Sequence, residues 1–173
     1  MKKQNLLFII FLFSFMIIGY GQPLENDDVV FGSYIKQSKL IDIPSYDETY
    51  LKLKELNFNR RESEIYKKVE ELSKAFGQKL NLKTFSEVER LNPQFSQWIL
   101  ENLELTSFKD IEEATAQYEE YLEASNQEFK ENKDFHIYLF AVLDKFGPEI
   151  YSKVLTDYEI EKIKKIEKAN SKK

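Results

Sequence analysis

The feature that most restricts the fold is a long apolar stripe with helical spacing in the second half of the chain. Its members follow one another at steps of three and four residues, which places side chains on one face of an α-helix. Gly147-Pro148 ends the stripe, because proline has no backbone N–H to continue a helix. The stripe therefore predicts a mainly helical fold. Its members are Phe108, Ile111, Thr115, Tyr118, Leu122, Ser125, Phe129, Asn132, His136, Leu139, Leu143 and Phe146.

The stripe is compatible with one long helix or with two. A single helix of about 39 residues would measure about 58 Å, whereas a compact domain of this length has a diameter of about 40 Å. Residues 108–129 are apolar on one side only, but residues 135–146 are apolar on nearly every side. Asn132-Lys133-Asp134 could provide a turn and a cap between them. We favour two helices, and one long helix, paired in a dimer, is the alternative.

Further helices are predicted on both sides of this stripe. The periodicity indicates a helix over about residues 61–76, with Gly77 just past its end in a left-handed conformation. Asn92-Pro93 is typical of a helix start, because proline suits the first helical position. Four pairs have the spacing of a capping box and predict helix starts: Ser45 with Glu48, Thr84 with Glu87, Ser107 with Asp110, and Thr156 with Glu159.

The N-terminus predicts a secretory signal peptide over residues 1–21. Lys2 and Lys3 precede an apolar run over residues 6–18. That run is shorter than the roughly 20 residues that cross a bilayer, and it matches the apolar part of a signal sequence. Gly19 and Gly21 supply small residues for cleavage before Gln22. We expect a secreted or periplasmic protein with no stable membrane anchor after cleavage; an uncleaved anchor is the alternative.

Residues 22–44 predict an extended lead, because they lack helical spacing; one short strand is expected around Val29 to Ile35. Residues 45–173 are expected to form a single helical domain. The fold class is thus all-α: a small irregular helical bundle of about six helices, after an N-terminal signal peptide and a short extended lead. Cleavage would remove two lysines and no acid, changing the net charge from −5 to −7.

The residues that usually carry chemistry are scarce. The chain has no cysteine, one histidine and five glycines, so thiolate metal sites and disulfides are excluded. No nucleophile elbow and no phosphate-binding glycine loop is present. The Glu-x-x-His motif is also absent, because the residue three before His136 is Lys133. We therefore expect no catalytic residue, cofactor or metal site. His136 is interpreted as a partly buried structural residue, with Asn132 as a local partner.

Charge is distributed unevenly along the chain. Residues 101–134 hold 11 acidic side chains against three lysines, whereas residues 161–173 hold six lysines and two glutamates. Glu112, Glu119 and Glu123 share one helix face, which predicts contact with a basic protein partner through long-range attraction. Charge complementarity within the molecule is the other explanation. Net acidity and few arginines argue against nucleic-acid binding.

Three functions remain open. We favour an exported, non-catalytic helical protein that acts by protein–protein interaction with a partner not identified by the sequence. The first alternative is a soluble carrier of an apolar small ligand, held between the aromatic-rich helices; the apolar residues 135–146 and Trp98 suggest it. The second is an enzyme that uses His136 and nearby acids. The sequence leaves the oligomeric state open.

Overall fold

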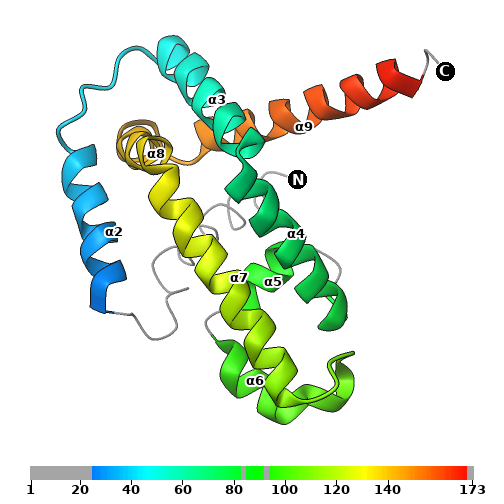
Figure 1. Cartoon of the computed structure of the whole chain (residues 1–173). Coiled ribbons are helices and arrows are strands. Elements are labelled where there is room, and N and C mark those ends of the chain that lie inside the picture. The colour runs from blue at the N-terminus through cyan, green and yellow to red at the C-terminus, as the bar shows by residue number, and fades with distance from the viewer. Residues whose placement is uncertain (1–24, 83–84, 92–93, 171–173) are drawn as a thin grey trace.

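In the computed structural model, which describes residues 25–82, 85–91 and 94–170, all regular secondary structure is helical (Figure 1). The all-α fold class is confirmed for these residues. The predicted signal peptide, residues 1–21, lies outside them, as do Thr84 and Asn92-Pro93. The α-helices are α2 (Glu25–Ser38), α3 (Tyr46–Glu62), α4 (Glu64–Lys79), α5 (Phe85–Leu91), α6 (Phe95–Asn102), α7 (Ile111–Glu131), α8 (Lys133–Phe146) and α9 (Glu149–Asn170), with a short 3₁₀-helix η2 (Leu103–Leu105) after α6.

The apolar stripe forms two helices, as favoured above. Asn132 ends α7 and precedes α8, and Figure 1 shows the chain changing direction there. Gly147 ends α8 with a φ of +75°, which glycine adopts without steric cost. The predicted start was wrong by one turn: Asp110, rather than Ser107, is the N-cap of α7. Its carboxylate accepts a hydrogen bond from the Glu113 amide at 2.8 Å.

The extended lead predicted over residues 22–44 is wrong over residues 25–38, whereas residues 41–44 have no regular secondary structure. Residues 25–38 form helix α2, and no strand is present around Val29 to Ile35. The helix packs on α8, where the ring of Phe31 lies 5.4 Å from that of Phe140 between centroids. It also packs on the end of α7, where the buried Tyr34 lies 4.8 Å from the ring of Phe129 between centroids. This tertiary packing overrides the low helix propensity of the Val29-Val30 pair and Gly32.

Gly77 does not end α4, contrary to the prediction. It lies inside the helix, where a Cβ atom would come within 2.7 Å of Val88 Cγ2 on α5. Glycine thus allows α4 and α5 to approach closely. Asn81, with a φ of +58°, adopts the left-handed conformation after the helix.

Helix α9 starts earlier than the capping pair at Thr156 predicts. The Thr156 hydroxyl lies within the helix and donates to the Ser152 carbonyl at 2.9 Å instead of capping a new helix. Ser45, in contrast, caps α3 as predicted.

Two main apolar clusters fill the interior. The aromatic core lies between α4, α5, α6 and α7; its buried members are Val69, Phe76, Leu80, Val88, Phe95, Ile99, Phe108, Ala114, Tyr118, Tyr121 and Ala124. The α8 core lies between α3, α8 and α9; its buried members are Ile43, Leu53, Phe135, Tyr138, Leu139, Ala141, Val142, Ile150, Tyr151 and Val154. A smaller cluster joins α2 to α7 and α8.

Candidate functional site

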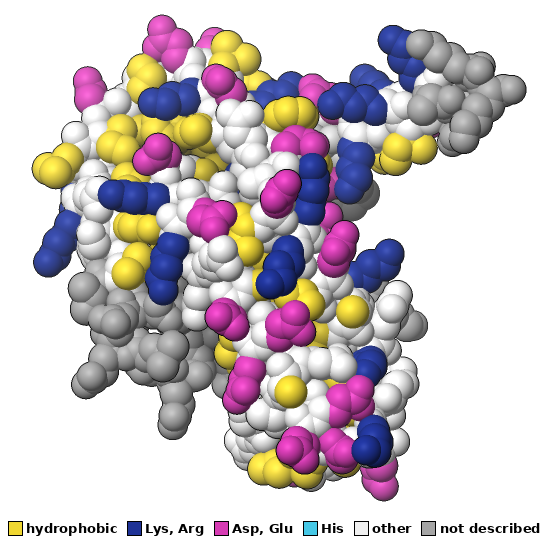
Figure 2. Space-filling view, in the orientation of Figure 1, with side chains coloured by type: hydrophobic (Ala, Val, Ile, Leu, Met, Phe, Trp, Pro, Cys, Tyr) yellow, Lys and Arg dark blue, Asp and Glu magenta, His cyan; other side chains and the backbone are white. Residues whose placement is uncertain are grey.

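The three predicted partner-contact residues lie together on the exposed side of α7. Glu112, Glu119 and Glu123 are all exposed, and among the described residues none forms an ion pair or hydrogen bond. Two other acids of α7 are paired within the molecule: Glu113 with Lys79 on α4, and Glu128 with Arg60 on α3. Intramolecular complementarity therefore accounts for only part of this acidic helix. Figure 2 shows acidic side chains gathered over the part of the molecule where α6 and α7 lie.

The structure also reveals a buried charged cluster that joins α3, α7 and α8. Arg60 Nε donates to Glu128 Oε1 at 2.6 Å and its Nη2 donates to Oε2 at 3.3 Å, so the pair is bidentate. Asn132 Nδ2 donates to the same Oε1 at 3.0 Å, and His136 Nε2 lies 3.5 Å from Oε2. The side chains of Arg60, Glu128 and His136 are 14%, 7% and 0% exposed. One carboxylate on α7 thus binds Arg60 of α3 and lies against His136 of α8.

The ionisation states of this cluster follow from burial and charge. Burial alone would raise the pKa of Glu128, but the Arg60 guanidinium and the His136 contact outweigh it and lower that pKa to about 2. Burial lowers the pKa of His136, and the charge of Arg60 adds to this effect, while Glu128 opposes it. His136 is therefore neutral and Glu128 charged at neutral pH.

His136 is buried more completely than the sequence predicted. The rings of Phe129 and Phe135 lie 4.5 and 5.1 Å from its ring, measured between centroids. Neither of its nitrogens makes a hydrogen bond of good geometry among the described residues, and Asn132 binds Glu128 rather than His136. An imidazole with no exposed surface is out of reach of a solvent-borne substrate in this conformation.

The sequence interpretation missed Arg60 and Glu128. A signal for Glu128 exists, because Glu128, Asn132 and His136 follow one another at steps of four on one helical side. No local signal points to Arg60, which lies 68 residues before Glu128.

A hollow of about 330 Å³ lies between the end of α2 and α8. Its rim carries the charged side chains of Lys39, Asp42, Asp144 and Lys145, and Ile41 and Ile43 add apolar surface. Lys145 also donates to the Ile43 carbonyl. Most small-molecule sites are predominantly apolar, so this charged rim gives the apolar-carrier hypothesis no specific support.

In residues 25–82, 85–91 and 94–170, no group of three or more histidine, aspartate or glutamate side chains is arranged to hold a metal ion. No helix in this part of the chain combines the length and the apolar character needed to cross a membrane. No family model matches the chain, and no curated protein or solved structure matches it significantly.

Proposed function

We propose that the protein is exported and acts without catalysis, by protein–protein contact, with Glu112, Glu119 and Glu123 as the contact surface for a basic partner. The supporting observation is that these carboxylates are exposed on one side of α7 and lack partners among the described residues. Carboxylates in this state attract a basic surface from a distance and increase its rate of association. The buried Glu128, in contrast, is already neutralised by Arg60.

A retention experiment tests this contact. Immobilised mature protein is incubated with the extracellular or periplasmic fraction of its source, beside the triple variant Glu112→Gln, Glu119→Gln, Glu123→Gln. We expect a basic protein to be retained about tenfold less well by the triple variant, because three exposed charges contribute about 0.5 kcal/mol each. High salt should weaken the retention by the unmodified protein.

A matched control carries three glutamine substitutions at other exposed glutamates, Glu55, Glu70 and Glu71, which lie on α3 and α4. This control loses three negative charges, as the first triple variant does, and it should retain the partner as well as the unmodified protein does. If the two triple variants lost the partner equally, net charge rather than the α7 surface would be responsible. Failure to retain any basic protein, even at low salt, would contradict the proposal.

Export is tested separately by N-terminal sequencing of the protein from its source. We expect Gln22 as the first residue, in the periplasm or the medium. An intact Met1 on a cytosolic product would contradict export.

A further inference from the structure

Helix α9 consists of a packed half and a projecting half. Ile150 and Val154 in the packed half are fully buried, whereas every residue from Ile160 to Lys168 is exposed. Figure 1 shows this second half extending away from the rest of the molecule.

Contacts with α3 fix which side of the projecting half faces outward. Asp157, Glu161 and Lys165 follow one another at steps of four and therefore share a side. Tyr50 donates to Asp157, Lys54 Nζ lies 2.6 Å from Glu161 Oε1, and Lys165 Nζ lies 4.9 Å from the ring centroid of Phe58. These α3 contacts orient the helix.

Three isoleucines lie on the side opposite Asp157, Glu161 and Lys165, beyond Glu159, which pairs with Arg61 at the end of α3. Ile160, Ile163 and Ile166 are 43%, 54% and 53% exposed, at steps of three residues. Lys162 and Lys164 lie at the two edges of this stripe. We call these five residues the α9 arm. Glu167, four residues after Ile163, is an acidic side chain on the same side. The stripe is otherwise apolar and edged with lysines, which suits it to docking against a surface that is both apolar and acidic.

A surface of that kind exists in another part of the molecule, at α6, which Figure 1 shows far from the projecting half of α9. Leu100 on α6 and Leu105 on η2 are 65% and 61% exposed. Glu101 and Glu104, which stand between these two leucines in the sequence, are also exposed. We call these four residues the α6 end.

One lysine lies next to this surface in the sequence. Lys109, which follows the α6 end, lies 3.6 Å from Asp110, so that acid offsets part of its charge.

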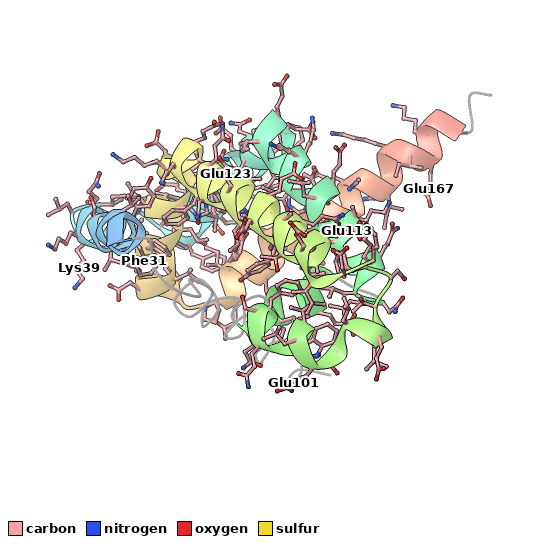
Figure 3. All side chains as sticks on the ribbon, turned by 60° about the horizontal axis from the view of Figure 1, so that its bottom comes forward. Phe31, Lys39, Glu101, Glu113, Glu123 and Glu167 are labelled. Atoms are coloured by element: carbon pink, nitrogen blue, oxygen red, sulfur yellow. The ribbon has the colours of Figure 1, made fainter. Side chains whose placement is uncertain are left out.

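The two surfaces cannot meet within one molecule. Figure 3 shows Glu101, at the α6 end, and Glu167, on the projecting half of α9, on separate parts of the molecule.

We infer that the α9 arm of one copy docks on the α6 end of a second copy. Isoleucines then cover leucines, and Lys162 and Lys164 meet Glu101 and Glu104. Because the two surfaces differ, the contact is head-to-tail. The apolar area is small compared with the roughly 800 Å² per partner of a stable interface, so the association is weak and salt-dependent. This inference goes beyond the proposed function, since it requires no other protein.

The absence of native cysteine allows a direct cross-linking test. Ile166→Cys and Leu105→Cys proteins are mixed at about 100 µM, a concentration suited to a weak contact, and oxidised in low salt. We expect the mixed disulfide to exceed both homodimeric disulfides several-fold. Leu51→Cys on α3, which is similarly exposed at 64%, is the matched control for random collision with Ile166→Cys.

Each other result overturns the inference. Predominance of the Ile166→Cys homodimer would mean that arm pairs with arm. A mixed disulfide no more abundant than with Leu51→Cys would mean that the α6 end is not the docking surface. A third result would assign the α9 arm to a lipid surface instead. In that case cross-linking is absent, and the unmodified protein co-sediments with anionic vesicles whereas the Ile163→Glu variant does not.

Exchange of charges between the two surfaces gives a second, independent test. The first step adds Lys162→Glu and Lys164→Glu to the Ile166→Cys protein, which should reduce the yield of mixed disulfide at least fivefold. The second step adds Glu101→Lys and Glu104→Lys to the Leu105→Cys protein, which should restore that yield. Absence of restoration would contradict the pairing. As a control, Glu119→Gln together with Glu123→Gln should leave the yield of mixed disulfide unchanged. The cross-linking result therefore distinguishes failure of this inference from failure of the proposed α7 contact.

Discussion

The aromatic core and the region around α8 are held together by different interactions. In the aromatic core, Phe76 lies 5.0 Å from Phe95 and 5.8 Å from Phe108 between ring centroids. Around α8, Glu128 binds Arg60 and contacts His136 in a nearly closed interior. Apolar packing is insensitive to pH, whereas buried charges stabilise the fold only in one ionisation state. The two regions should therefore respond differently to truncation and to acid.

Phe76→Ala should give the largest effect. The side chain is 2% exposed, so its removal loses apolar burial and leaves a cavity. We expect the free energy of unfolding to fall by about 4 kcal/mol, measured by urea denaturation. Phe58→Ala, which removes an exposed ring on α3, should lower the free energy of unfolding far less. Equal losses would show that the aromatic core is not tightly packed.

Glu128→Gln should lower the free energy of unfolding by about 3 kcal/mol, because the charge of Arg60 would remain buried without its partner. The control is Glu123→Gln on the same helix, which should change it by no more than about 0.5 kcal/mol. Adding Arg60→Met to Glu128→Gln should restore part of the loss. A neutral effect of Glu128→Gln alone would contradict the cluster's structural role.

Acid should destabilise the protein through His136 first. Because its folded-state pKa is below the ordinary 6.5, the unfolded chain binds more protons below that pH and stability falls, at up to about 1.4 kcal/mol per pH unit. Below pH 4.5, Glu128 adds a second loss that continues to about pH 2. His136→Gln should flatten the fall just below pH 6.5 in urea denaturation curves. An unchanged slope would mean that His136 is not the responsible group.

Gly77→Ala should give the smallest effect, lowering the free energy of unfolding by about 1 kcal/mol. The close contact of the added Cβ atom with Val88 outweighs the better helix propensity of alanine. In a Val88→Ala background the same change should instead stabilise the protein. If Gly77→Ala were stabilising in both backgrounds, close packing of α4 on α5 would not be the reason for glycine.

Local patterns predicted much of the fold. The steps of three and four, Gly147-Pro148 and the Ser45 cap depend on neighbouring residues, so a single sequence displays them. Helix α2 was missed because its stability comes from contacts with Phe129 on α7 and with α8, distant in sequence. Gly77 was misinterpreted for the same reason, since its partner Val88 lies on another helix.

The candidate site divides in the same way. The exposed positions of Glu112, Glu119 and Glu123 follow from their places on the helix. The pairing of Arg60 with Glu128 depends on how α3 meets α7, and no local pattern contains that information. What a charge does in this protein thus depends on whether the packing of helices buries it.

The most direct test of this contrast is a two-dimensional NMR titration from pH 7.5 to 4.0 that follows amide signals from α4 and from α8. We predict that α8 signals, including Phe135 and Ile137, change or broaden below pH 6.5, while α4 signals around Phe76 stay unchanged until a lower pH. Simultaneous loss of both sets at one pH would contradict the account.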